Sequence, residues 1–273
     1  MAKKCIVTLL TDFGLADPYV AEMKGVILGI APEVTLVDVT HQVPSGDVMA
    51  GAFVLRQSLP YFPAGTVHVV VVDPTVGTER RIIAARYAGQ TVIFPDNGLI
   101  TFVDRDQPLE QMVAVRNEQY FLAPGVSATF HGRDVMAPVA AHVARGLALG
   151  QLGPPPESFK LLDIPPPCED VDGSLVGQVI YVDKFGNLIS GISADVLDVV
   201  PGDETGPEIF CGGVPVGPLQ TSYASAPAGE PVALINSMSL LEVAVNGGRA
   251  CDVLSAGAGT AIRVARRRPR GAS

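Results

Sequence analysis

Apolar runs alternate with amphipathic segments through the first half of the chain. Three short apolar runs predict strands: CIVTLL (5–10), VTLVDV (34–39) and VHVVVV (67–72), and the last is nearly all apolar, as is typical of a strand covered on both faces. Helical spacing of apolar residues after Asp17-Pro18 predicts one helix up to Ile30, and a second helix is expected from about Asp47 to Tyr61. Strands that alternate with helices predict a largely parallel sheet.

Two further elements complete this predicted domain. The segment IIAARYAGQTVIF (82–94) has the pattern of a hairpin that turns at Ala88-Gly89. The apolar spacing is again helical from about Asp134 to Leu149. We therefore predict an N-terminal α/β domain, with a largely parallel central sheet, over residues 1–152.

The pattern changes after residue 152. Two triple-proline runs within 153–170 predict an extended linker. Short β-type runs separated by Gly and Pro turns follow: LVGQVIYVD (175–183), NLISGIS (187–193), PEIFCGG (207–213), PVALINS (231–237) and AIRVARR (261–267). They predict a smaller all-β, barrel-like C-terminal domain over 171–265, before a basic tail, 266–273.

Composition narrows the classes of function. The 273-residue chain is 48% hydrophobic and 17% charged, as expected of a globular protein, and its formal net charge of −9 argues against nucleic acid as a partner. The four cysteines show no CxxC spacing. No run is long and apolar enough for a membrane span or a signal peptide, so we expect a cytoplasmic protein with no membrane partner.

Polar side chains gather where the predicted strands end. Asp12, His41, Asp73 and Asn97 follow four successive apolar runs. The carboxyl ends of parallel strands meet at one edge of a sheet, where ligands of α/β proteins bind. If these strands lie side by side, the four residues share one rim. The segment FHGRD (130–134) brings His131 and Arg133 to the start of the last predicted helix.

Structural roles compete with functional ones at these positions. The alternatives are Asp17 and Asp134 as helix N-caps, Asp96-Asn97-Gly98 as a turn, His41 as a loop brace, and His68 and His142 as packed side chains. Asp73 is harder to explain, because a carboxylate that ends a valine run must be solvated, paired or used. A purely structural ion pair with Arg80 is its main alternative.

Several kinds of site are not supported by the sequence. Asp12, Asp73, His41 and His131 lack HxH or HExxH spacing, and Arg80 would repel a cation, so we expect no metal. No GxGxxG follows a predicted strand, and neither GxSxG nor a P-loop occurs. The DFG of TDFG (11–14) is not accompanied by an HRD loop.

Six segments in order carry a family resemblance. They are TDFGLADPYVAEMKGVI (11–27), VVDPTVGTERR (71–81), FPDNGL (94–99), TFHGRDVMAPVAAH (129–142), YVDKFGNLIS (181–190) and INSMSLLEVAVNGG (235–248). Together they resemble the S-adenosyl-L-methionine (SAM) hydroxide adenosyltransferases, or SAM hydrolases, which are related to the fluorinase and chlorinase. The resemblance spans both predicted domains.

This resemblance implies a function and an assembly. It implies hydrolysis of SAM to adenosine and L-methionine by attack of an activated water on ribose C5′, without a metal or another cofactor. Asp73, Arg80 and His131 would hold and activate the water. The resemblance also implies a homotrimer, in which SAM lies between the N-terminal domain of one subunit and the C-terminal domain of its neighbour.

A set of substrate-binding residues follows from the same motifs. Asp12 would hold the ribose hydroxyls, with Asp17 as the second acid of its motif, and Phe130 would wall the reacting centre. Asp183 and Ser237 would hold the methionine end of SAM. Adenine would be bound by Asn187, Asn246, Gly247 and Tyr223, and the set is completed by Asn97, Phe185 and Glu242.

Particular positions separate the branches of this family. The halogenating relatives typically have tyrosines at the positions of Asp73 and His131 and a serine near Gly132, so this chain resembles the hydroxide-using branch. Three positions depart from the usual pattern: Thr75 in the DPTVG turn where DPGVG is common, and Gly46 and Met238 where the fluorinase has tryptophan and arginine. A halide-dependent SAM transferase and a non-catalytic SAM or adenosine sensor are the alternatives.

Overall fold

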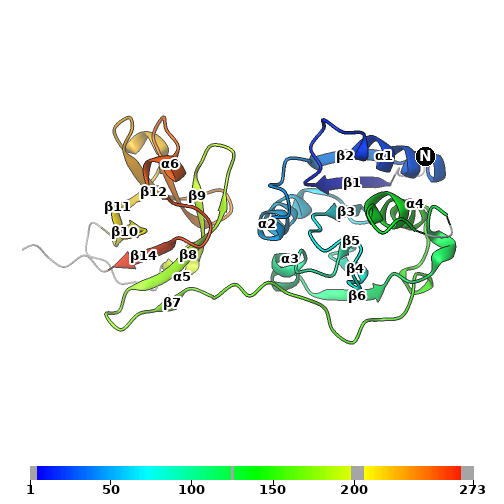
Figure 1. Cartoon of the computed structure of the whole chain (residues 1–273). Helices are drawn as coiled ribbons and strands as arrows, with labels where there is room; N and C mark the ends of the chain where they lie inside the picture. Colours follow the sequence, from blue (N-terminus) through cyan, green and yellow to red (C-terminus); the bar gives the residue numbers. More distant parts are fainter. Residues whose placement is uncertain (1–4, 124–125, 198–205, 266–273) are drawn as a thin grey trace, which may run out of the picture. The chain divides into compact units, whose positions relative to one another are not determined.

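The computed structural model of the protein describes residues 5–123, 126–197 and 206–265, in two compact units, Met1–Leu162 and Asp163–Ser273 (Figure 1). The end of the first unit is held to the segment that follows its fifth strand, because Lys160 N and Leu162 N donate to Asp96 Oδ1 and Thr101 Oγ1 (both 2.7 Å). The linker limits of 153 and 170 stay a sequence prediction. The predicted basic tail, 266–273, lies outside the described residues.

A six-stranded sheet forms the centre of the first unit. Its strands are β1 (Ile6–Thr11), β2 (Thr35–Thr40), β3 (Val67–Val71), β4 (Ile82–Tyr87), β5 (Gln90–Pro95) and β6 (Leu109–Ala114). They lie in the order β2-β1-β3-β5-β4-β6, and β2, β1, β3 and β5 pair in parallel. The sheet is therefore largely parallel, as predicted, and the four parallel strands end at one edge.

Helices cover both faces of this sheet (Figure 1). One face carries α1 (Tyr19–Ile30) and α4 (Ala137–Ala144), and the other carries α2 (Val48–Ser58) and α3 (Thr101–Asp106). Every residue of β3 is buried, which explains its uninterrupted apolar run. Val69 and Val71 pack in one core cluster with Met23 and Ile27 of α1. Single turns of 3₁₀ helix lie at Leu59–Tyr61, Glu118–Tyr120, Leu149–Gln151 and, in the second unit, Tyr223–Ser225.

The helix predicted from Asp134 to Leu149 has different limits. It begins two residues earlier as a π-helical turn, Gly132–Met136, and its α-helical part ends at Ala144. The end is set by Gly146, whose φ of +99° belongs to a region that favours glycine. Asp134 lies inside the π-helical turn and accepts from Ser127 N (3.2 Å), so it is not the N-cap.

The second unit is a closed β-barrel, as the sequence predicted. Its strands are β7 (Cys168–Glu169), β8 (Leu175–Val182), β9 (Leu188–Ser193), β10 (Glu208–Cys211), β11 (Val214–Gln220), β12 (Pro231–Ile235), β13 (Leu240–Val245) and β14 (Ala261–Ala265). Neighbours pair in the order β14-β10-β11-β12-β13-β9-β8-β7, and β14 also pairs with β8, which closes a ring of seven strands. Two short helices, α5 (Ala194–Leu197) and α6 (Ala250–Val253), accompany them.

Alternate side chains of the barrel strands fill its interior. Leu188, Leu241, Val243 and Ile262 come from three strands and are almost fully buried in one cluster. The closed ring leaves no free edge among its seven strands. In the part of the chain that the structure describes, no helix combines the length and apolar character needed to cross a membrane.

Candidate active site

A hollow of about 380 Å³ opens at the carboxyl edge of the first sheet. Its walls come from Asp12 and Phe13 after β1, Asp73, Pro74 and Val76 after β3, and residues 129–132 before α4. Ser45, Gly46 and Val71 complete the lining. Parallel α/β sheets bind their ligands at this edge. The hollow is therefore the candidate active site of the first unit.

Asp73 ends the valine strand, and donors of its own turn surround its carboxylate. Oδ1 accepts from Thr75 N (3.2 Å) and Thr75 Oγ1 (3.1 Å). Oδ2 accepts from Arg80 Nε (2.7 Å) and pairs with Arg80 Nη2. Only 5% of the Asp73 side chain and 3% of the Arg80 side chain are exposed. Two donors on each oxygen fill the acceptor positions of a carboxylate, so its charge is compensated where it is buried.

Arg80 also joins Asp73 to His131. Its Nη2 donates to His131 Nδ1 over 2.8 Å. A guanidinium only donates, so Nδ1 must accept, and the proton of the neutral imidazole lies on Nε2. Burial, and then the charge of Arg80, lower the pKa of His131, against the opposing effect of Asp73 and Asp134. His131 therefore brings a neutral ring with an Nε2–H donor to the hollow that it lines.

The turn that carries Arg80 packs closely against the segment that carries His131. Gly77 has a φ of +82°, and a Cβ at this position would lie 2.6 Å from Ala128 O. Only glycine fits both requirements. His131 itself precedes the π-helical turn, a feature that occurs often at functional sites. The close approach at Gly77 is what brings two segments about fifty residues apart in the sequence to one point.

Asp12 lines the hollow beside an aromatic cluster. Asp12 Oδ2 accepts from Gly46 N (2.8 Å), so one carboxylate oxygen already has a backbone hydrogen-bond partner. Phe13, Tyr19 and Phe130 make three edge-to-face contacts, with ring centroids 5.3 to 5.8 Å apart. Phe13 and Phe130 line the hollow. The structure thus combines a carboxylate with an apolar wall.

The other predicted residues of the first unit lie near this edge but outside the hollow's lining. Asn97 Nδ2 donates to Val72 O (2.9 Å), which fixes the backbone just before Asp73. His41 is buried and braces the loop after β1, with Nδ1 2.9 Å from Thr11 Oγ1 and Nε2 3.0 Å from Asp38 Oδ1. Asp17 is exposed and makes no capping bond to α1, so the capping alternative is not seen.

Two more predicted alternatives concern histidines. His68 is buried in β3 between Thr8 Oγ1 and Gln90 Oε1, each 2.7 Å from a ring nitrogen. His142 of α4 makes an edge contact with Tyr120. Both are packed side chains, as the alternatives proposed.

In the second unit, a tight turn gathers Asp183 and Asn187. Asp183 Oδ1 accepts from Phe185 N and Asn187 N (both 2.9 Å), and Oδ2 accepts from Asn187 Nδ2 (3.0 Å). Gly186 allows the turn, with a φ of +82°. The Phe185 ring is held outward and is 71% exposed. Such an exposed aromatic ring is available for contact with another molecule.

A buried carboxylate lies in the same unit. Glu242 of β13 accepts from Tyr223 Oη (2.8 Å) and Asn236 Nδ2 (3.1 Å). Burial raises the pKa of Glu242, and the charge of Asp183 adds to this effect, while the two hydrogen bonds oppose it. Burial and the bond to Glu242 raise the pKa of Tyr223 to about 12. The structure therefore brings Asp183, Glu242 and Tyr223 into electrostatic contact.

Ser237, Asn246 and Gly247 lie on turns that flank β13. Asn236 Oδ1 accepts from Met238 N (3.0 Å) and Leu240 N (3.2 Å), which holds the turn with the exposed Ser237. Asn246 Nδ2 donates to Ala226 O (2.8 Å), and Gly247 is exposed with a φ of +72°. Ser237, Asn246 and Gly247 border the strand of Glu242, and of the residues in these two turns Asn236 is the one described with a hydrogen bond to its side chain.

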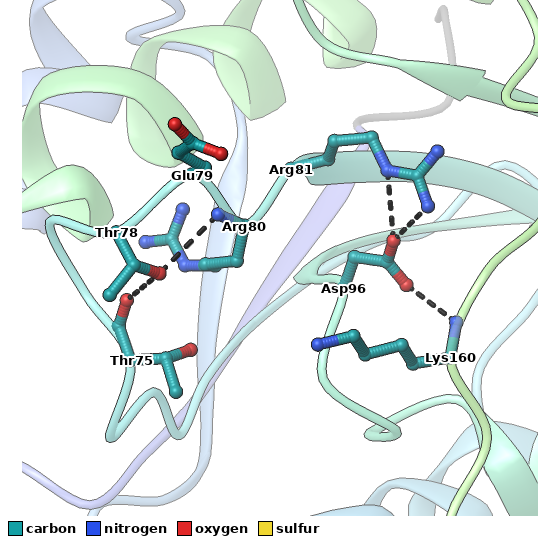
Figure 2. Close-up of a pocket in the computed structure, with 7 residues that line it drawn as sticks. All are labelled: Thr75, Thr78, Glu79, Arg80, Arg81, Asp96 and Lys160. Atoms are coloured by element: carbon teal, nitrogen blue, oxygen red, sulfur yellow. Dashed lines mark hydrogen bonds and ion pairs between the residues drawn. The ribbon is translucent and has the colours of Figure 1, made fainter.

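A second hollow, of about 480 Å³, lies behind the turn of Arg80 (Figure 2). Arg81 Nε donates to Asp96 Oδ2 (3.0 Å), and Asp96 Oδ1 accepts from Lys160 N (2.7 Å). Asp96 N also donates to Arg81 O (2.9 Å). Because the charges of Arg81 and Asp96 are paired, we interpret this network as a brace that fixes the residue after Arg80 to the end of β5.

Some residues of the site were not predicted from the sequence. Thr75 was noted only as a departure, yet it supplies two of the donors to Asp73. Its spacing from Asp73 is that of an Asx turn, which was a usable signal. Asn236 could have been found in the same way, because its side chain accepts from Met238 N, two residues on, as in an Asx turn. The donation from Gly46 N to Asp12 has no sequence signal. Among the described residues, no group of three His, Cys, Asp or Glu side chains could hold a metal ion.

Comparisons with known proteins identify the family of the chain. The profile of the SAM hydroxide adenosyltransferase N-terminal domain matches residues 7–153, and that of the C-terminal domain matches 177–263. The (R)-S-adenosyl-L-methionine hydrolase of Salinispora arenicola is 40% identical over 269 residues, covering 97% of this chain and 99% of the relative. A fluorinase of Actinoplanes sp. is more distant, 31% identical over 271 residues, with 88% and 91% covered.

A solved structure shows the same fold. The crystal structure of an uncharacterised conserved protein from Thermotoga maritima superposes with a TM-score of 0.87 at 34% identity. The match covers 95% of this chain and 100% of that one. Both units of the present fold are therefore found together in that protein.

Proposed function

The chain belongs to the SAM hydroxide adenosyltransferase family, and on that premise we propose that it hydrolyses SAM to adenosine and L-methionine. The observation that carries the proposal is the assembly of Asp73, Arg80 and His131 at one hollow, joined by hydrogen bonds of 2.7 and 2.8 Å. The hydrolases that resemble this chain are named for the (R) epimer at sulfur, and we extend that preference to this protein.

The reaction needs little beyond a well-placed water. SAM is a sulfonium, so methionine leaves as a neutral thioether when the C5′–S bond breaks and needs no general acid. The water oxygen forms the new bond to C5′, and its proton passes to solvent. Alignment behind C5′ and exclusion of other water supply much of the rate in such displacements. We propose no metal or other cofactor in this step.

The three residues divide this work. We assign to His131 Nε2–H the hydrogen bond that orients the water oxygen, because Nδ1 is already occupied by Arg80. The charge of Arg80 favours hydroxide character in that water. Asp73 keeps Arg80 in place, since both Nε and Nη2 of Arg80 contact one of its oxygens. The set thereby acts mainly by orientation and electrostatic stabilisation.

The remaining predicted residues would bind the substrate. We assign the ribose hydroxyls to Asp12, supported by Asp17, and the wall of the reacting centre to Phe130, with Asn97 behind Asp73. Asp183 and Ser237 would hold the methionine end. The adenine would lie with Asn187, Tyr223, Asn246 and Gly247, and Phe185 and Glu242 would complete that side. The grouping of Asp183, Tyr223 and Glu242 supports this assignment.

We further propose a homotrimer whose sites combine the first unit of one subunit with the second unit of its neighbour. Exposed apolar side chains occur near the candidate residues of both units, which supports an assembly that covers them. Leu15 is 69% exposed, next to the motif of Asp12, and Phe185 is 71% exposed, in the turn of Asp183. Four free cysteines fit a reducing compartment, and the cytoplasm is the proposed location.

The function is tested by incubating the protein with (R)-SAM and with (S)-SAM and following adenosine and methionine by chromatography. We expect equal amounts of both products, with faster consumption of the (R) epimer. Asp73→Asn, Arg80→Ala and His131→Ala should each lower kcat at least a hundredfold while adenosine still binds, because the triad acts on water rather than on the nucleoside.

Other outcomes would reject parts of this proposal. Folded protein that binds adenosine but forms none from SAM would indicate a sensor. Formation of 5′-halo-5′-deoxyadenosine only when chloride or fluoride is added would indicate a halide-dependent transferase. Full activity in one of the three variants would remove that residue from the catalytic set.

A further inference from the structure

The turn between Asp73 and Arg80 is closed by a ring of hydrogen bonds. Asp73 Oδ1 accepts from Thr75 Oγ1 (3.1 Å), and Thr75 O accepts from Thr78 Oγ1 (2.8 Å). Thr78 Oγ1 in turn accepts from Arg80 N (3.3 Å), and Arg80 Nε returns to Asp73 Oδ2 (2.7 Å). Figure 2 shows the links from Arg80 to Thr78 and from Thr78 to Thr75 on the wall of the second hollow.

Two threonine side chains in this ring, Thr75 and Thr78, do not pack in the core. Thr75 and Thr78 are exposed residues, so neither fills the core. Each hydroxyl is nevertheless hydrogen-bonded within the turn. A surface threonine far from a special feature is usually exchanged at little cost. Here, the hydroxyls of Thr75 and Thr78 are instead linked by hydrogen bonds to a buried carboxylate and to the backbone of the residue that carries a buried guanidinium.

The two oxygens of Asp73 accept from different residues. Oδ2 accepts from Arg80, and Oδ1 accepts from the backbone N–H and the hydroxyl of Thr75. Without the Thr75 hydroxyl, Oδ1 keeps only the Thr75 N–H as a donor, and the carboxylate is held less firmly against rotation about its Cβ–Cγ bond. Arg80 would follow, because two of its nitrogens contact Oδ2. The Nη2 that holds His131 lies on the same rigid guanidinium.

We propose that Thr75, supported by Thr78, is a positioning residue that aims Arg80 at His131 by fixing the rotamer of Asp73. Thr75 touches neither substrate nor the reacting atoms in this proposal. Its kinetic test rests on the proposed function, but its structural test does not.

The kinetic experiment compares Thr75→Val with Thr75→Ser. Valine keeps the shape of the side chain and removes the hydroxyl, whereas serine keeps the hydroxyl. We expect Thr75→Val to lower kcat about tenfold with KM changed less than twofold, because hydrogen bonds to charged groups are strong and this one does not contact substrate. Thr75→Ser should restore kcat to within about twofold of the wild type.

Thr66→Val is the matched control. Thr66 Oγ1 also closes a turn, by donating to Pro63 O (2.7 Å), but at the opposite end of β3 from Asp73. Its loss should lower the melting temperature without changing kcat. Thr78→Val removes the next link of the ring and gives the same test by itself if Thr75→Val does not fold.

The structural experiment measures exchange of the Arg80 Nε–H with water by ¹⁵N NMR, with the signal assigned through Arg80→Lys. We expect exchange at least fivefold faster in Thr75→Val, and wild-type rates in Thr75→Ser and Thr66→Val. Wild-type exchange or wild-type kcat in a folded Thr75→Val would overturn the inference. A wild-type protein without SAM turnover would reject the proposed function, while the exchange rates would still decide the role of Thr75.

Discussion

At the scale of single residues, His131 offers a direct measurement of the site's electrostatics. Its pKa is lowered by burial first and by Arg80 second. Protonation of His131 would also remove the lone pair on Nδ1 that accepts from Arg80. Neutral His131 is therefore the form that the structure stabilises, and the protein should keep it neutral into mildly acidic solution.

We predict that His131 titrates below the ordinary histidine value of about 6.5. A group whose pKa is lowered on folding binds its proton more readily in the unfolded chain. Its contribution to stability is therefore present above pH 6.5 and is lost as the pH falls into the window between the unfolded and folded values. Histidine NMR titration measures this pKa, and His131→Gln identifies the signal among the four histidines.

Arg80→Gln provides the control for this titration. It removes the positive charge that lowers the pKa of His131, so the signal of His131 should titrate at higher pH than in the wild type. A wild-type value above 6.5 would contradict the prediction. An unchanged value in Arg80→Gln would show that burial alone sets the pKa.

At the scale of elements, the turn after β3 depends on a close approach that one glycine permits. Gly77 and Gly65 both have positive φ, +82° and +87°, but only Gly77 faces a backbone atom, Ala128 O, at 2.6 Å from a Cβ. The comparison of the two glycines therefore separates conformational strain from the clash.

We predict that Gly65→Ala lowers the free energy of unfolding by about 1 kcal/mol, from strain alone. Gly77→Ala should cost at least about 2 kcal/mol, because the turn must also move away from residue 128. Urea unfolding measures both. The kcat of Gly77→Ala should fall as well, since that movement separates Arg80 from His131, whereas Gly65→Ala should keep wild-type kcat. Equal losses in the two variants would show that the contact at Ala128 is not restrictive.

Buried strands were easier to predict from the sequence than exposed ones. β1 and β3 are covered on both faces, so their sequences are continuous apolar runs that the pattern identifies. In contrast, the first three residues of β6 are exposed, and the polar Glu110 and Gln111 interrupt the apolar pattern by which a strand is predicted. β11 contains two prolines within a barrel strand and gave no strand signal either.

The candidate site was predictable to a different degree. A carboxylate at the end of a buried run marks Asp73 from the sequence alone, because burial demands a partner. Burial alone does not distinguish Arg80 from its neighbour Arg81, so the ion pair with Arg80 was one alternative at the sequence level rather than a conclusion. The structure sends Arg80 to Asp73 and Arg81 to Asp96. Turn conformation depends on hydrogen bonds among Thr75, Thr78 and the backbone, which no periodicity encodes.

At the scale of the whole molecule, the proposed shared site can be tested by complementation. Under the proposed function, Asp73→Asn should inactivate the first-unit half of a site, and Asp183→Asn should weaken the second-unit half. In a trimer with sites between subunits, co-expressed variants form some sites from two intact halves. We predict that mixed trimers recover about one quarter of wild-type activity, the share expected for random assembly around a ring.

Light scattering provides the accompanying control, with an expected mass three times that of the 28.5-kDa chain. Mixing the two variants after purification, without subunit exchange, should give no recovery. No recovery in co-expressed trimers of the correct mass would place both halves of each site in one subunit.

The closure of the barrel also dictates an order of events during synthesis on the ribosome. The first unit has all its strands by Ala114 and its last α-helix by Ala144. The barrel, in contrast, needs β14 to bridge β10 and β8, and β14 ends at Ala265. At about 5–20 residues per second, the second unit waits roughly 6–24 s after the first can fold, with two strand edges unpaired. The two halves of a nascent chain of this protein therefore become complete at different times, the second only once β14 has been made.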